Sequence, residues 1–269
     1  MKILNRTTGD EVIFKLSKFP DGQVDVEIVS YTDHHHLYQI RKSITSFLDL
    51  QEILCATAAL KARDIENIEL YTPYILGLRS DRAFVLDGMR YIKDVIAPIL
   101  NQQGYKAVKT IDPHSYVAEN CINNLNSISM DYITALHRVD FKKTILLSPD
   151  AGAEAKCKKV YNSLKHLFSG FETAKKLRVE DNIITTIPDM PKDANIVIID
   201  DIIDGGGTLL GIRQALRDAG HTGEVSIIIT HAIFSKGIDI IMENFDRVIT
   251  TNSFQEFEER ENLIVLKVI

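Results

Sequence analysis

Short apolar runs alternate with amphipathic segments along this chain, and the alternation predicts β-strands separated by α-helices. The runs are bounded by glycine, proline or aspartate, as is typical of strands. The amphipathic segments carry apolar residues at helical spacing, for example Phe47, Leu48, Ile53 and Leu54. The predicted strands are residues 2–5, 11–15, 24–29, 67–71, 107–111, 144–147, 195–199, 225–230, 247–250 and 263–269, and the predicted helices are residues 43–63, 91–102, 153–167, 209–219 and 237–244.

Strands that alternate with helices indicate an α/β fold, with mainly parallel sheets flanked by helices on both faces. A length of 269 residues favours about two domains at ~150 residues each. The two halves repeat one strand–helix pattern, so we expect domains over residues 1–140 and 141–269. Ligands of such sheets bind beyond the carboxyl ends of the strands. Polar residues gather after four predicted strands, which end at Tyr71, Ile111, Leu147 and Ile199.

Composition and charge exclude several classes of protein. Apolar residues make up 45% of the chain and charged residues 25%, which is ordinary for a globular protein. Acidic residues outnumber basic ones by 37 to 31, and the net charge of −6 disfavours a general nucleic-acid binder. No apolar run reaches the ~18 residues that span a membrane, and the first residues lack the apolar core of a signal peptide. The three cysteines lie far apart, so we expect free thiols in a reducing cytoplasm.

The segment at 196–208, I-V-I-I-D-D-I-I-D-G-G-G-T, is the strongest chemical signal. Glycines let backbone N–H groups approach an anion, and the following helix N-terminus favours negative charge, so the loop predicts a phosphate cradle. The adjacent carboxylates suit a cis-diol, and a phosphate beside a diol describes a ribose phosphate. The alternative is a tight strand–helix turn with acidic caps. The residues predicted to bind ribose phosphate are Asp200, Asp201, Asp204, Gly205, Gly206, Gly207 and Thr208.

This segment resembles the ribose-binding signature of type I phosphoribosyltransferases and of ribose-phosphate pyrophosphokinases. Five further segments resemble the second family, in family order: F-P-D-G-Q at 19–23, P-Y-I-L-G-L-R-S-D-R at 73–82, T-I-D-P-H-S at 110–115, S-P-D-A-G at 148–152 and T-H-A-I-F-S at 230–235. The resemblance implies two phosphoribosyltransferase type I-like domains. It also implies Mg²⁺-dependent transfer of the β,γ-diphosphate of ATP to the C1 hydroxyl of ribose 5-phosphate, with release of AMP.

The resemblance implies ATP-side roles for residues of the first half. The F-P-D-G-Q loop matches a family loop that reaches a neighbouring subunit's nucleotide site, which implies at least a homodimer, although P-D-G alone would be a plain turn. His114 and Asp150 match positions associated with Mg²⁺, a cation that takes few protein ligands beside phosphate oxygens. The triplet at 34–36, H-H-H, lacks partners at metal-ligand spacing and predicts a surface loop. The ATP-binding residues that the resemblance implies are Phe19, Asp21, Gln23, Arg79, Asp81 and His114.

The basic segment at 174–178, A-K-K-L-R, occupies the place of the family's flexible catalytic loop. The resemblance then implies that Lys176 and Arg178 stabilise the transferring phosphoryl group, the first as a point charge and the second as a bidentate fork. If the alignment of this segment with the family loop shifts by one residue, Lys175 takes the role given to Lys176. A short basic cluster is also common on solvated surfaces, so this assignment depends on its position in the chain.

Gly205 departs from the family, which usually has threonine there, and we expect the glycine to open space on the 5′ side of the ribose. That space supports an alternative acceptor, ADP-ribose, which would give ADP-ribose pyrophosphate for NAD salvage. A regulatory pseudoenzyme is a further alternative, which the retained acidic and basic site residues disfavour. The last alternative is a plain phosphoribosyltransferase that acts on a base, and this function would leave the ATP-side segments unexplained.

Overall fold

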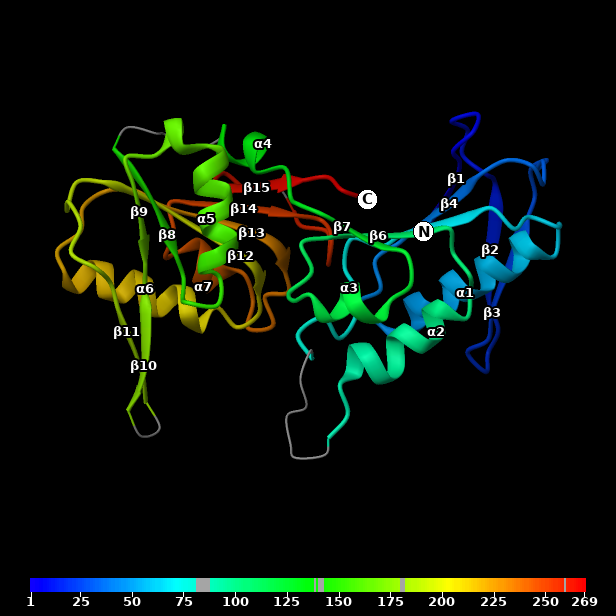
Figure 1. Cartoon of the computed structure of the whole chain (residues 1–269), viewed down its shortest axis with the longest axis horizontal. Coiled ribbons are helices and arrows are strands. Elements are labelled where there is room, and N and C mark those ends of the chain that lie inside the picture. The colour runs from blue at the N-terminus through cyan, green and yellow to red at the C-terminus, as the bar shows by residue number, and fades with distance from the viewer. Residues whose placement is uncertain (81–87, 138, 140–142, 180–181, 259) are drawn as a thin grey trace. The chain divides into compact units, whose positions relative to one another are not determined.

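The computed structural model describes the whole chain except residues 81–87, 138, 140–142, 180–181 and 259, and except the side chains of 133, 177–179 and 182–184. The chain divides into two compact units, the first comprising Met1–Ser129 with Ile269 and the second Met130–Val268. The predicted domain boundary at residue 140 lies outside the described residues and stays a prediction. Both units have the α/β architecture that the strand–helix alternation predicts, and the fold class is confirmed (Figure 1).

The first unit is built on a five-stranded sheet with the strand order β1-β4-β5-β6-β7. Strand β1 runs antiparallel to β4, and the remaining neighbours are parallel. Helix α1 packs against β3 and β4, and it begins after Ser46, whose side chain accepts a hydrogen bond from the Asp49 backbone N–H. The strands are β1 (Lys2–Asn5), β2 (Phe14–Lys18), β3 (Val24–Ile28), β4 (Tyr38–Arg41), β5 (Ile68–Tyr71), β6 (Ala107–Ile111) and β7 (Leu125–Ile128), and the helices are α1 (Phe47–Lys61), η1 (Ile92–Ile96), α2 (Ala97–Asn101) and α3 (Val117–Cys121).

The single helix predicted over residues 91–102 is a π-helical turn followed by an α-helix. The Ala97 backbone N–H donates to the Ile92 carbonyl five residues earlier. The next residue, Pro98, has no N–H to donate. The change of helix type therefore falls at the start of α2, where a proline is tolerated because the first N–H groups of an α-helix have no partner within the helix.

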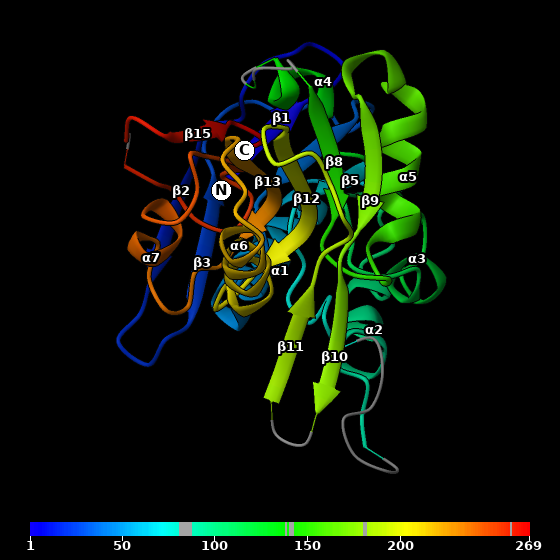
Figure 2. The ribbon, with the colours of Figure 1, turned by 90° about the vertical axis from the view of Figure 1, so that its left-hand side faces the viewer.

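The second unit is built on a six-stranded, fully parallel sheet with the order β15-β14-β13-β12-β8-β9. Helices α6 and α7 contribute to one core with the side chains of one sheet face, while α5 lies on the opposite face, where the Cys157 thiol donates to the Ile199 carbonyl (Figure 2). The strands are β8 (Thr144–Ser148), β9 (Gly170–Thr173), β12 (Asn195–Ile203), β13 (Val225–Ala232), β14 (Arg247–Thr251) and β15 (Leu263–Leu266), and the helices are α4 (Tyr132–Leu136), α5 (Glu154–Ser163), η2 (Lys165–Leu167), α6 (Gly207–Asp218) and α7 (Asp239–Met242).

Strand β9 and helix α4 of this unit were not predicted from the sequence, and two further differences concern the site. Strand β12 does not stop at Ile199 but continues to Ile203, because β13 pairs with it through Ile203↔Ala232. Both adjacent acids are therefore strand residues. The segment predicted as a catalytic loop forms strand β10 (Lys175–Val179), which pairs antiparallel with β11 (Asn182–Thr186). This hairpin projects from the sheet in Figure 2.

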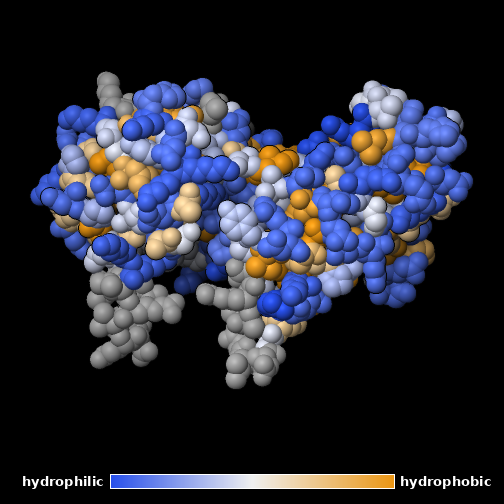
Figure 3. All heavy atoms as spheres, viewed as in Figure 1, coloured by the Kyte–Doolittle hydropathy of each residue, from blue (hydrophilic) through white to orange (hydrophobic). Residues whose placement is uncertain are grey.

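No helix among the described residues is long and apolar enough to cross a membrane. The face of the molecule drawn in Figure 3 is mainly hydrophilic, with scattered apolar residues.

Candidate active site

Three predicted site residues meet in the second unit, each carried by a different element. Asp150 lies in the loop after β8, Lys176 is on β10, and Thr208 is in the first turn of α6. The Lys176 Nζ donates to Asp150 Oδ2 at 3.0 Å and to Thr208 Oγ1 at 2.6 Å. Strands β8 and β12 are parallel neighbours, so the loops that follow them lie at the same edge of the sheet. This lysine-centred cluster is the core of the candidate site.

Asp150 is held by hydrogen bonds on both carboxylate oxygens. Its Oδ1 accepts from the backbone N–H groups of Gly152 and Ala153, at 3.0 and 3.1 Å, at the start of α5. Partial burial opposes ionisation, but the hydrogen bond from Lys176 and those from the backbone outweigh it, so the pKa of Asp150 is lowered. The carboxylate is therefore negative at neutral pH and fixes the position of the lysine.

Lys176 is the lysine of the basic segment that contacts Asp150 and Thr208, while the alignment of this segment with the family's catalytic loop stays a prediction. Adjacent residues of a strand point to opposite sides, so Lys175 cannot share this arrangement. Lys175 pairs with Thr186 and Arg178 pairs with Ile183 in the hairpin ladder. The Arg178 side chain is outside the described part of the chain, and its predicted role stays a prediction.

The three glycines of the loop have different surroundings. Gly206 has a φ of +73°, and a Cβ built there would lie 2.5 Å from Cδ1 of Ile241, so only glycine fits. A Cβ at Gly207 would meet no atom within 4 Å. A Cβ at Gly205 would lie 3.2 Å from Cε of Lys236. The space expected beside Gly205 is thus taken by a lysine side chain, which corrects the prediction of open space there.

The two adjacent acids at the end of β12 differ from ordinary surface carboxylates. Asp201 is buried and Asp200 is half-buried, and the Asp201 backbone N–H donates to Asp200 Oδ1 at 2.9 Å. Burial, followed by repulsion from the Asp201 carboxylate, raises the pKa of Asp200. The Lys156 ammonium acts in the opposite direction with a smaller effect. Asp204 follows in the loop and is half-buried.

The predicted adenine-side residues of the first unit lie at the turn between β2 and β3. The backbone N–H of Phe19 donates to the Gln23 carbonyl at 2.8 Å, and the Gln23 N–H donates to Asp21 Oδ1 at 3.0 Å. The Phe19 ring is 48% exposed although it is large and apolar. The turn is therefore locally fixed and presents an aromatic face to the surroundings.

The other predicted ATP-side residues follow parallel strands of the first sheet. Arg79 is exposed in a turn after β5, and His114 is exposed in the loop after β6. A Cβ at the neighbouring Gly77 would lie 2.4 Å from the Tyr91 ring, and the φ of this residue is +90°, so the turn requires glycine. Asp81 lies outside the described residues.

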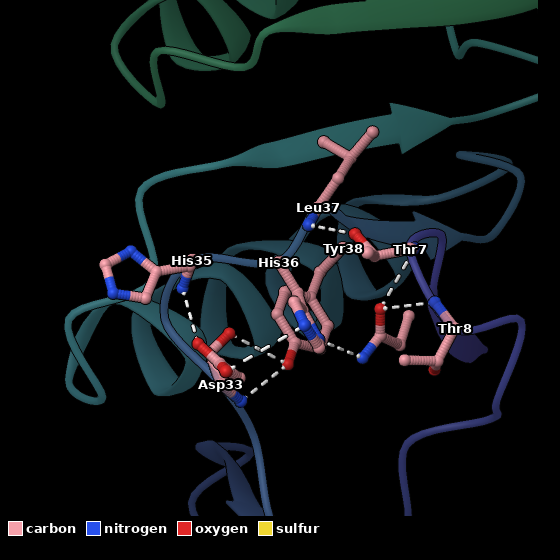
Figure 4. A network of polar contacts seen from close by, with 8 residues as sticks. Thr7, Thr8, Asp33, His35, His36, Leu37 and Tyr38 are labelled. Atoms are coloured by element: carbon pink, nitrogen blue, oxygen red, sulfur yellow. Dashed lines mark hydrogen bonds and ion pairs between the residues drawn. The ribbon is translucent and has the colours of Figure 1, made fainter.

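Two residues of the histidine triplet at 34–36, His34 and His35, are exposed, and His36 is half-buried. His36 Nδ1 lies 3.0 Å from the Asn5 side chain, and the Asp33 carboxylate accepts from the His35 N–H at 2.9 Å (Figure 4). Across the described part of the chain, Asp33, His34 and His35 form the one group of three possible metal ligands whose donor atoms lie within 4.8 Å of one another.

Lys236 is the residue near the glycine loop that sequence reasoning missed. It follows the T-H-A-I-F-S segment, but a lone exposed lysine gives no signal in a sequence. Only the tertiary contact with Gly205 identifies it. His231 of the same segment is fully buried, with Nδ1 2.8 Å from Ser253 Oγ, and is a core residue.

Comparisons with known proteins identify a family and relatives of this chain. The model of the phosphoribosyl transferase domain family matches residues 118–263. The ribose-phosphate pyrophosphokinase of Campylobacter jejuni subsp. jejuni is 29% identical over 94% of this chain and 83% of its own. That of Mycoplasmopsis pulmonis is 26% identical over 99% of this chain and 86% of its own.

A solved structure gives a fold likeness along nearly the whole chain. The phosphoribosylpyrophosphate synthetase from Mycobacterium smegmatis superimposes with a TM-score of 0.82 at 19% identity, covering 97% of this chain and 88% of that one. The predicted resemblance to ribose-phosphate pyrophosphokinases, which are transferases, is confirmed. Because the family model matches more than half of its length, the chain belongs to the phosphoribosyl transferase domain family.

Proposed function

We propose that this protein transfers the β,γ-diphosphate of ATP to the C1 hydroxyl of ribose 5-phosphate, giving phosphoribosyl pyrophosphate and AMP. The observation that carries the proposal is the Asp150–Lys176–Thr208 cluster beside the glycine loop. It sets a fixed cation next to a phosphate cradle. The curated relatives named ribose-phosphate pyrophosphokinase support the same reaction.

Acceptor binding is assigned to the end of β12 and the start of α6. Backbone N–H groups of the glycine loop and the N-terminus of the 12-residue helix α6 favour the 5-phosphate. Asp200 and Asp201 accept hydrogen bonds from the ribose diol. A diol that donates to Asp200 stabilises the ionised carboxyl, which offsets the raised pKa in the free protein.

In the reaction, the C1 oxygen of the ribose forms a bond to the β-phosphorus of ATP, and the bond from this phosphorus to the α–β bridging oxygen breaks. The hydroxyl proton passes to water, and AMP leaves with the bridging oxygen. Negative charge grows on the oxygens of the diphosphate group during the transfer, so a fixed ammonium lowers the activation barrier. Lys176 is placed for this task, and Asp150 and Thr208 orient it. Arg178 is proposed as a second cation for the same oxygens.

Mg²⁺ is the cofactor we propose, with Asp150 of the second unit as a protein ligand. His114 of the first unit stays a predicted Mg²⁺-associated residue on the strength of the resemblance alone. The Asp150 carboxylate is the hard oxygen donor that Mg²⁺ prefers, and its side chain is 36% exposed. When bound, the cation neutralises charge on the ATP phosphate oxygens. The ATP-side assignments of Phe19, Asp21, Gln23, Arg79 and Asp81 are part of the same proposal.

ADP-ribose is a second candidate acceptor for the same chemistry. It has the same C1 hydroxyl and diol, with a longer group on the 5′ side. The open space around Gly207 is the observation that supports it, since a side chain there would meet no atom within 4 Å. AMP release with each acceptor in separate assays decides between them.

A homodimer is proposed from the turn between β2 and β3. The turn carries the exposed residue Phe19, and it matches the loop that reaches a neighbouring subunit's nucleotide site in the family that the sequence resembles. Sedimentation velocity is expected to give at least a dimer, and Phe19→Ser is expected to shift the equilibrium towards a monomer. A fully active monomer would contradict the proposal.

A further inference from the structure

We infer that Lys236 binds the phosphate group that the acceptor carries on its 5′ carbon, beside the glycine loop at 205–207. The inference rests on the proposed function and deepens it, since it names a further binding residue for the acceptor. Three observations carry it: the path of the lysine side chain, the turn that holds it, and the charges around it.

The Lys236 side chain crosses the position that a side chain at Gly205 would occupy. A Cβ at Gly205 would lie 3.2 Å from Cε, 3.3 Å from Cδ and 3.6 Å from Cγ of Lys236. The φ of Gly205 is outside the left-handed region, so the backbone itself does not require glycine there. The absence of a side chain at Gly205 leaves room for the lysine stem, and the ammonium is bonded directly to Cε, the atom that would lie nearest to a Cβ at Gly205.

The turn that carries Lys236 is fixed to the end of β12. The Ile233 N–H donates to the Ile203 carbonyl at 2.8 Å, which ties the chain after β13 to the chain before the glycine loop. Phe234 is 6% exposed and packs edge-on against Phe257. The Gly237 N–H closes the turn on the Phe234 carbonyl at 2.8 Å. Lys236 is therefore presented by an anchored turn rather than by a free loop.

The charges around Lys236 favour an anion. Within the described residues Lys236 makes no hydrogen bond or ion pair, whereas Lys176 is paired with Asp150. The N-terminus of α6, which begins at Gly207, carries partial positive charge and repels a nearby cation. A phosphate in the loop would compensate the charge of the lysine, through a charge-assisted hydrogen bond, and the partial charge of the helix N-terminus, through hydrogen bonds from the helix N–H groups.

The test compares Lys236→Ala and Lys236→Arg with the wild type, using Mg-ATP with ribose 5-phosphate or with ADP-ribose. Lys159→Ala is the matched control, because Lys159 is an exposed lysine of the same unit on α5. We expect Lys236→Ala to raise the KM for the acceptor by roughly tenfold or more, with kcat within about threefold of the wild type. Lys236→Arg should recover most of the loss, and Lys159→Ala should change neither constant.

A second comparison uses the contact with Gly205. Gly205→Ala should raise the acceptor KM in the wild type, since the new methyl group crowds Lys236, and should raise it less in the Lys236→Ala background. Equal constants for Lys236→Ala and Lys159→Ala with an active enzyme would overturn the role of Lys236. A wild type that releases AMP with neither acceptor would overturn the proposed function instead. Calorimetric titration with ribose 5-phosphate then decides: weaker binding in Lys236→Ala supports the role, and unchanged binding overturns it.

Discussion

A single ammonium group connects the three elements of the candidate site. Lys176 contacts a carboxylate in one loop and a hydroxyl in the first turn of α6, and its side chain is 30% exposed. An exposed ion pair of this kind contributes little to folding. The ion pair therefore serves to fix the position of the lysine: Asp150, whose pKa is lowered, holds the ammonium in the place where the proposed mechanism uses it.

We expect Lys176→Ala to lower kcat by about 100-fold or more, as for the loss of a preorganised charge. The KM for the acceptor should change by less than about threefold, because the charge meets the transferring group rather than the sugar. Steady-state AMP release measures both, with Lys175→Ala as the matched control on the opposite side of β10. The pKa of Asp150, followed by carboxyl NMR, should rise in Lys176→Ala. An unchanged kcat would contradict the assignment.

The raised pKa of Asp200 makes a prediction about stability. A carboxyl whose pKa in the folded state exceeds its unfolded value of about 4 binds more protons when folded. The free energy of unfolding therefore falls as the pH rises from about 4 through the folded pKa. We expect Asp200→Asn, which cannot ionise, to raise the Tm by about 3 °C or more at pH 9 and to give no gain at pH 4. Calorimetry on this variant and on exposed Asp189→Asn measures the difference. An increase in Tm that is equal at pH 4 and pH 9 would show that ionisation of Asp200 is not the cause of the stabilisation.

At the scale of elements, the glycine loop joins the end of β12 to the start of α6. Gly206 is favoured by the fold, because its φ is +73° and because a Cβ built there would lie 2.5 Å from Cδ1 of Ile241, whereas a Cβ at Gly207 would meet no atom within 4 Å. Neighbouring glycines in one loop thus serve different purposes. One is needed for folding, and the other leaves the cradle open.

We expect Gly206→Ala to lower the free energy of unfolding by ~2–4 kcal/mol, from the left-handed backbone and the contact with Ile241. Gly207→Ala should leave the free energy of unfolding within ~0.5 kcal/mol of the wild-type value. It should raise the KM for the acceptor, because the new methyl group fills the proposed phosphate site. Urea unfolding followed by fluorescence or circular dichroism measures the first effect. Equal midpoints for the two variants would contradict this account of the loop.

The parts of the site that could be predicted from sequence are those with a local cause. Glycines, adjacent acids and an apolar strand identify the β12–α6 loop, because backbone freedom and burial act within a few residues. The β10–β11 hairpin could not be predicted from its own residues, since A-K-K-L-R has no clear strand alternation. Its pairing depends on a second segment of the chain. The contact between Gly205 and Lys236 likewise exists only in the folded chain.

At the scale of the whole molecule, the chain is two compact α/β units. The alternation of strands and helices was enough to predict the α/β architecture, because parallel sheets need a crossover connection between neighbouring strands. The rhythm could not give the strand order, since β1, β7 and β9 are edge strands whose pairing depends on distant segments. Strand β7 also carries little apolar signal, since three of its four residues are exposed.

The central claim is that a diphosphate group, and not a single phosphoryl group, is transferred from ATP. The most direct measurement is ³¹P NMR of a reaction with the full-length protein, Mg-ATP and ribose 5-phosphate, with chelator added to a parallel sample. We predict that AMP and a sugar 1-diphosphate form in equal amounts and that the chelated sample forms neither. Formation of ADP with a sugar monophosphate would mean transfer of the γ-phosphoryl group alone and would contradict the account.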